Sequence, residues 1–115
     1  MPPAPAGAPV AVFAALADPT RWQLLDLLAE ADRSASALSR AVPVSRSAVL
    51  KHLAVLERAE LVGRHRSGRE VRFSVRPERL AATARWIEAT AAAWDTRLAA
   101  LRELAEGRSA PGNAG

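Results

Sequence analysis

The sequence predicts a mainly helical domain with one small β-hairpin, arranged as a winged helix-turn-helix. Three observations predict this fold class. Capping residues precede several short apolar segments, an amphipathic segment with a basic face follows Ser45, and two strand-like segments flank Ser67-Gly68. The expected order is four helices, the hairpin and a final helix.

Capping residues and one proline set the helix boundaries. Asp18 followed by Pro19 is typical of an N-cap and a first helical position, and Ser34 and Ser45 are suitable caps for the next two helices. Trp22 and four leucines are expected to form the buried face of the second helix. The predicted helices cover residues 10–17, 19–30, 35–41, 46–59 and 79–106.

The hairpin is predicted from strands at residues 61–66 and 70–76, joined by a two-residue turn at Ser67-Gly68. In the second strand valine and phenylalanine alternate with charged residues, so one face is expected to be buried. A turn closed at Ser67-Gly68 would place His65 opposite Glu70.

Composition indicates one domain over residues 10–106, with disordered tails at 1–9 and 107–115 that are rich in proline, glycine and alanine. The chain has no cysteine, which excludes disulfides and thiolate metal sites. No apolar run is long enough to span a membrane, and the first residues lack the pattern of a signal peptide. We therefore expect a cytoplasmic protein.

The positive charge is concentrated in the middle of the chain. Residues 33–79 hold eleven basic and four acidic side chains, whereas the whole chain has a net charge of only +4. Such a block is typical of a protein that binds a polyanion, although an ordinary solvated surface is the alternative.

The segment after Ser45 has two chemically different faces at helical spacing. One is apolar apart from His52 and is expected to pack on the core, whereas the other is basic and polar. On that face Arg46 is suited to guanine, Ser47 to a base edge or phosphate, and Leu50 to a thymine methyl group. Lys51 and Arg58 are suited to phosphates, and the hairpin arginines to the flanking minor groove or the DNA backbone. The predicted DNA-binding residues are Ser45 (which also serves as a helix cap), Arg46, Ser47, Leu50, Lys51, Arg58, Arg64, Arg66 and Arg69.

The last predicted helix carries apolar residues at alternating spacings of four and three. This stripe is more than one small core can cover, so part of it is expected to meet a second copy, although burial within the domain is the alternative. Two-fold symmetry would then require an inverted-repeat operator. The predicted dimer interface comprises Val10, Phe13, Ile87, Trp94, Leu98 and Leu101.

Three segments resemble the ArsR/SmtB family of bacterial winged-helix repressors: residues 13–21 with the leucines that follow, residues 45–56, and residues 68–73. The resemblance spans residues 10–104 and implies a homodimer that represses its own or a neighbouring operon. One departure is Glu60, which stands where the family usually has glycine, so the helix end must tolerate a side chain there.

No metal site and no cofactor are expected, because the family's metal ligands are missing: cysteine is absent and the last helix has no histidine. No catalytic residues are expected either, since Ser67 and His65 lack an orienting partner and no phosphate-binding loop is present. The chain is therefore predicted not to be an enzyme. A winged-helix module that binds protein instead of DNA is the competing hypothesis, and a small-molecule effector is left open.

Overall fold

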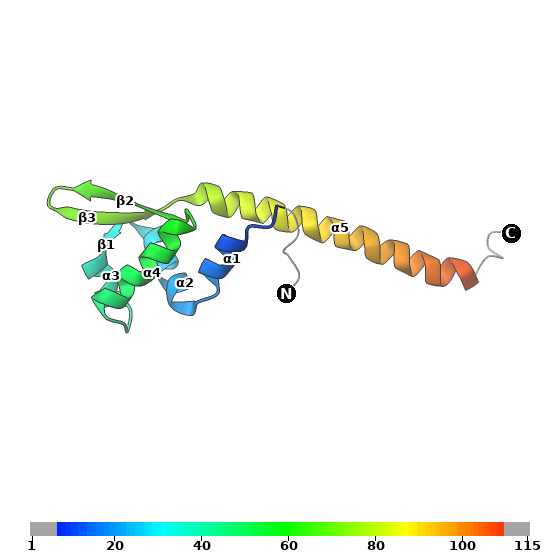
Figure 1. Cartoon of the computed structure of the whole chain (residues 1–115), viewed down its shortest axis with the longest axis horizontal. Coiled ribbons are helices and arrows are strands. Elements are labelled where there is room, and N and C mark those ends of the chain that lie inside the picture. The colour runs from blue at the N-terminus through cyan, green and yellow to red at the C-terminus, as the bar shows by residue number, and fades with distance from the viewer. Residues whose placement is uncertain (1–6, 110–115) are drawn as a thin grey trace. The chain divides into compact units, whose positions relative to one another are not determined.

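The computed structural model describes residues 7–109, which are drawn as the coloured ribbon in Figure 1. The chain divides into two units, and the boundary lies between Thr83 and Ala84. Of the tails predicted at residues 1–9 and 107–115, residues 1–6 and 110–115 lie outside the described residues, whereas residues 107–109 continue the last helix. The elements in order are α1 (Val10–Leu16), α2 (Pro19–Glu30), β1 (Arg33–Ser34), α3 (Ala35–Ala41), α4 (Arg46–Arg58), β2 (Val62–Ser67), β3 (Glu70–Val75) and α5 (Pro77–Ser109).

The three predicted caps are confirmed. The carboxylate of Asp18 accepts hydrogen bonds from the backbone N–H groups of Thr20 (2.7 Å) and Arg21 (3.2 Å) at the start of α2. Ser34 caps α3 and Ser45 caps α4, each through its hydroxyl oxygen at 3.1 Å from a backbone nitrogen three residues on. These bonds satisfy donors that a helix N-terminus otherwise leaves unpaired, which is why these helices begin where they do.

The sheet has three antiparallel strands in the order β1-β3-β2, one strand more than predicted. Strand β1 pairs with β3, with Arg33 opposite Phe73 and Ser34 opposite Arg72. A strand of two residues is too short to show an alternating pattern in the sequence, so only its pairing with β3 reveals it. The prediction of a mainly helical winged helix-turn-helix is otherwise confirmed.

The turn of the hairpin lies one residue later than predicted. Ser67 pairs with Glu70, so Gly68 and Arg69 form the two-residue loop, and His65 faces Arg72 instead of Glu70. Gly68 has a φ of +65°, a conformation that the first loop position of a type II′ turn requires and that glycine adopts without steric cost.

The core of the first unit lies where α2, α3 and α4 meet the base of the sheet. Leu24, Leu38, Leu53 and Phe73 are among its fully buried side chains. Trp22 was predicted to join this core, but it is half exposed because it lies about 110° around α2 from the centre of the buried leucine stripe.

Helix α4 ends in a left-handed residue. Glu60 has a φ of +60°, its N–H donates to the carbonyl of Glu57 (2.9 Å), and the N–H of Leu61 donates to the carbonyl of Leu56 (2.9 Å). This pair of bonds is a Schellman motif, in which glycine is the usual left-handed residue. Helix α4 therefore ends in a Schellman motif that has a glutamate, instead of glycine, in the left-handed position.

Candidate nucleic-acid interface

Helices α3 and α4 and the four residues between them form the helix-turn-helix, and α4 has the two faces predicted for it. Val49, Leu53 and Leu56 are fully buried, whereas the opposite face is open to solvent. His52, expected on the buried face, is only partly buried, and its Nδ1 lies 3.3 Å from a guanidinium nitrogen of Arg21. The predicted contact residues Ser45, Arg46, Ser47, Lys51 and Arg58 are exposed, and Leu50 is partly buried.

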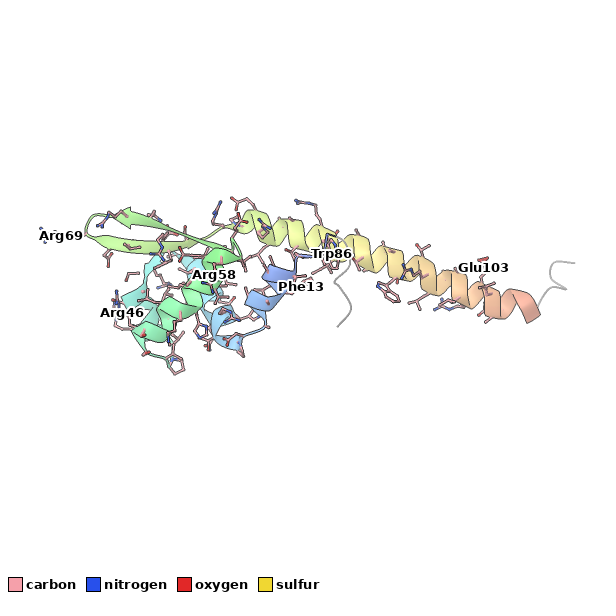
Figure 2. All side chains as sticks on the ribbon, viewed as in Figure 1. Phe13, Arg46, Arg58, Arg69, Trp86 and Glu103 are labelled. Atoms are coloured by element: carbon pink, nitrogen blue, oxygen red, sulfur yellow. The ribbon has the colours of Figure 1, made fainter. Side chains whose placement is uncertain are left out.

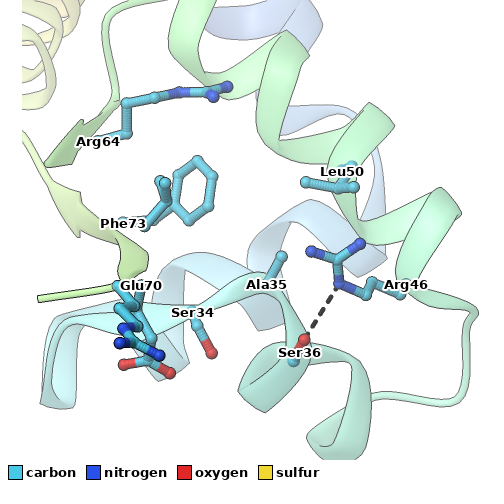
Figure 3. A pocket seen from close by; sticks show the side chains of 10 residues that line it. Ser34, Ala35, Ser36, Arg46, Leu50, Arg64, Glu70 and Phe73 are labelled. Carbon is cyan, nitrogen blue, oxygen red and sulfur yellow. Dashed lines mark hydrogen bonds between the residues drawn. The ribbon is translucent and has the colours of Figure 1, made fainter. Parts of the chain in front are cut away.

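The guanidinium of Arg46 is held by α3. Its Nε donates a hydrogen bond to the hydroxyl oxygen of Ser36 at 3.1 Å (Figure 3). The two terminal nitrogens of Arg46 remain available for a bidentate contact such as that made to guanine. The sequence did not single out Ser36, because a serine ten residues before Arg46 gives no local signal of this contact.

A cleft of about 390 Å³ lies between the first turn of α3, the N-terminal half of α4 and the β2–β3 hairpin, which we call the wing. Arg46 and Leu50 line it from α4, and Arg69 and Val71 line it from the wing (Figure 3 shows the α4 side). The cleft therefore separates the two elements that the sequence predicts to contact DNA.

The three wing arginines differ in their surroundings. Arg69 extends beyond the tip of the hairpin (Figure 2), and Arg66 lies one residue before the end of β2 and is also exposed. Arg64 was expected near the tip, but it lies opposite Phe73 towards the base of the hairpin. Both ends of its guanidinium bind Glu57 of α4, with Nε 2.8 Å from Oε2 and Nη2 2.6 Å from Oε1.

Some of the basic residues of the central block form ion pairs, and others do not. Arg33, Arg64, Arg72 and Arg79 pair with nearby glutamates. Across residues 7–109, no carboxylate lies within 4.0 Å of five other cations on α4 and the wing. These five are Arg46, Lys51, Arg58, Arg66 and Arg69.

The six residues predicted for a dimer interface are all exposed in the single chain. In the first unit, the exposed fractions of Val10 and Phe13 are 53% and 39%. In the second unit, the described part of α5 leaves apolar side chains 48–61% exposed, namely Ile87, Trp94, Leu98, Leu101 and also Leu104. An apolar stripe of this kind on one helix is the surface expected where a partner packs.

Other kinds of site have little support among the described residues. Within residues 7–109 no three histidine, cysteine, aspartate or glutamate side chains cluster as metal ligands would. His65 has an acidic neighbour that the sequence did not indicate, with its Nε2 3.5 Å from Asp32 Oδ2, and both side chains are nearly half exposed. No described helix is long and apolar enough to cross a membrane.

Comparison with known proteins points to one family. The family model described as "Bacterial regulatory protein, arsR family" matches residues 18–63, which run from the cap of α2 into the first strand of the wing. The chain is 33% identical over 76 residues to the transcriptional repressor SdpR of Bacillus subtilis, covering 66% of this chain and 84% of that protein.

Solved structures agree in fold. An ArsR-like transcriptional regulator from Rhodococcus sp. RHA1 superposes with a TM-score of 0.82 at 47% identity, covering 85% of this chain and 90% of that one. A homodimeric winged helix-turn-helix DNA-binding domain from Mycobacterium bovis superposes with a TM-score of 0.58 at 28% identity, covering 77% of this chain and 80% of that one.

Proposed function

Because the chain belongs to the ArsR/SmtB family of bacterial winged-helix transcriptional regulators, we propose that it is a homodimeric repressor of its own or a neighbouring operon. The observation that carries this proposal is the set of five cations on α4 and the wing that have no carboxylate partner within the described chain. Cations that are not neutralised internally are able to replace the counterions around a phosphate backbone.

Within this proposal α4 is the recognition helix. Ser45, Arg46, Ser47 and Leu50 occupy its N-terminal turns, the part of such a helix that meets base edges in the major groove. Lys51 and Arg58 bind phosphates, which orient the protein without reading the sequence.

The wing carries the second contact. We propose that Arg66 and Arg69 reach the backbone or the minor groove beside the site, because both are exposed near the turn. Arg64 belongs to the same strand, but its guanidinium is engaged by Glu57, and its role is taken up below.

A second copy of the chain is the proposed partner for the exposed apolar residues. Val10 and Phe13 in the first unit, and Ile87, Trp94, Leu98 and Leu101 in the second, would contact the partner subunit. The relative from Mycobacterium bovis is a homodimer, which supports this assignment. A two-fold axis would place two recognition helices about 34–36 Å apart, in successive major grooves of an inverted repeat.

The test is DNA selection followed by titration. Wild-type protein selects binding sites from a random double-stranded library, and fluorescence anisotropy then compares the selected inverted repeat with a single half-site. We expect a symmetric consensus, and we expect the half-site to bind far more weakly. Failure to enrich any sequence would favour the competing function, a winged-helix module that binds protein.

The same titration tests whether a metal ion releases the DNA. We propose that the protein acts in the cytoplasm as a non-enzymatic regulator and needs no metal. Zinc, cadmium, arsenite or nickel at low micromolar levels should therefore leave the operator bound. Stoichiometric metal uptake coupled to release of DNA would contradict this part of the proposal.

A further inference from the structure

We propose that Glu57 is a positioning residue for the wing: its carboxylate, bound by Arg64, fixes the hairpin against the recognition helix and so strengthens operator binding. This inference rests on the proposed DNA-binding function. In this role an acidic residue strengthens the binding of a polyanion, and Arg64 supports the wing instead of contacting a phosphate.

The contact joins two elements in a well-defined geometry. Glu57 lies in the last turn of α4, and Arg64 lies in β2, one residue after Gly63. Two hydrogen bonds, of 2.8 and 2.6 Å, connect the planar carboxylate to the planar guanidinium. Bidentate pairs of this kind fix orientation as well as distance, since both groups must stay coplanar.

Phe73 completes the contact from the neighbouring strand. The guanidinium carbon of Arg64 lies 5.2 Å from the centre of the Phe73 ring, within the range of a cation–π interaction (Figure 3). Phe73 is 2% exposed, so it is itself fixed in the core. The hydrogen bonds that Arg64 donates to the carboxylate of Glu57 raise the pKa of Arg64 above its usual value, against the opposing effect of partial desolvation. Arg64 is therefore held from both α4 and β3.

Because of its position in the hairpin, this contact affects the orientation of the wing. The base of the hairpin is anchored by Leu61 and Val62, which are buried, whereas residues 66–72 are exposed. Gly68 in the turn lies four residues beyond Arg64, or about 13 Å along an extended strand. A rotation of the hairpin by roughly 10° at that point would move the tip by about 2 Å, which is enough to break a hydrogen bond.

Two roles for Arg64 predict opposite effects of changing Glu57. If Arg64 binds a phosphate directly, Glu57 competes with DNA, and Glu57→Gln should leave affinity unchanged or increase it. If the pair positions the wing, Glu57→Gln should decrease affinity, although the substitution removes a negative charge from a DNA-binding protein. The sign of the change in affinity therefore distinguishes the two roles.

The experiment measures operator affinity by anisotropy at several salt concentrations for Glu57→Gln, Arg64→Gln, the double variant and the exchange Glu57→Arg with Arg64→Glu. We expect each single variant to bind roughly 2- to 30-fold more weakly, as for other residues that couple without touching the ligand. The double variant should bind no more weakly than the single variants, because both changes break the same contact. The charge exchange should recover part of the loss.

Glu70→Gln is the matched control, because Glu70 pairs with Arg72 within β3 and does not link the wing to α4. It removes the same charge close to the tip, and we expect equal or tighter binding. Because Arg66 and Arg69 make the proposed wing contacts, a displaced wing should lower the salt slope equally in Glu57→Gln and Arg64→Gln, whereas a direct phosphate contact of Arg64 would lower the slope by about one in Arg64→Gln alone. A lower slope in Arg64→Gln alone, or tighter binding by Glu57→Gln, would overturn the proposal.

A readout without DNA separates this inference from the proposed function. Hydrogen exchange of the wing amides in the free, folded protein should be faster in Glu57→Gln and Arg64→Gln than in wild type and Glu70→Gln. If wild type binds no selected DNA, the proposed function fails, and the exchange rates still decide whether the pair holds the wing. Unchanged exchange in both variants would show that it does not.

Discussion

Replacing Glu60 with glycine tests the helix end that separates the recognition helix from the wing. A side chain in the left-handed conformation costs about 1–2 kcal/mol because its Cβ approaches the following carbonyl oxygen. Glu60 has a φ of +60°, so this cost is present in the folded protein. Glycine removes this cost, but it makes the unfolded chain more flexible, and this lowers the stability of the folded protein by about 0.5–1 kcal/mol.

The side chain of Glu60 also pairs with Arg79 at the surface. Both partners are about half exposed, so solvent screening limits the pair to about 0–1 kcal/mol. Glu60→Ala is the matched control, because it loses the same ion pair and keeps the left-handed side chain. The free energy of unfolding of Glu60→Gly should be about 0.5–1 kcal/mol higher than that of Glu60→Ala. This difference is the cost of the left-handed side chain minus the stability lost because glycine makes the unfolded chain more flexible.

Thermal unfolding measures this difference. For a domain of 60–100 residues, 1 kcal/mol shifts the melting temperature by about 4–8 °C, so Glu60→Gly should melt about 2–8 °C above Glu60→Ala. All samples need equal protein concentration, because a dimer's melting temperature depends on it. Glu60→Gln measures the ion pair alone. If Glu60→Ala melts at or above Glu60→Gly, the left-handed conformation is not the source of strain, and the reasoning fails.

Three further predictions concern base readout, dimerisation and pH. Arg46→Ala should relax specificity at one base position per half-site and cost about 1–3 kcal/mol of binding free energy. Lys51→Ala should weaken binding to all DNA sequences and lower the salt slope by about one. If Arg46→Ala selects the same bases as wild type from a DNA library, the assignment of Arg46 is wrong. Replacing Trp94 and Leu98 by alanine should shift the protein towards monomer in sedimentation velocity and lower operator affinity, and a double variant that stays dimeric would place the interface elsewhere. Desolvation raises the pKa of Asp18, but backbone hydrogen bonds from Arg21 and Thr20 lower it more, so the pKa is depressed in the folded state. Its contribution is therefore present above the unfolded pKa and lost as the pH falls through the folded pKa, and Asp18→Asn should show a shallower loss of stability in urea below about pH 4. If the stability of wild type and of Asp18→Asn depended equally on pH, Asp18 would not contribute to the loss of stability in acid.

Much of the fold could be predicted from the sequence because its determinants are local. Asp18 with Pro19 marked the start of α2, and Ser45 marked the start of α4, since a cap needs only its own hydroxyl or carboxylate and the next three residues. The faces of α4 followed from spacing alone, and Val49, Leu53 and Leu56 are buried as predicted. Strand β1 was missed because a two-residue strand exists only through its pairing with β3.

The arginines show where local reasoning ends. The sequence marks Arg64, Arg66 and Arg69 as three similar residues of one hairpin. Only the packing of the wing against α4 brings Glu57, seven residues earlier in the chain, to Arg64. The same holds for Ser36 and Arg46, which lie in different helices and meet through the geometry of the helix-turn-helix.

The sequence by itself determined the order of the helices and the hairpin, the starts of the first four helices and the concentration of positive charge, because caps, periodicity and composition act over a few residues. The tertiary structure decided which of those charges are neutralised internally, which two residues form the hairpin loop and which apolar residues remain exposed. These properties depend on contacts between elements far apart in the chain. The physical reason is that an ion pair or a buried face needs a partner surface, and folding alone determines which surface that is.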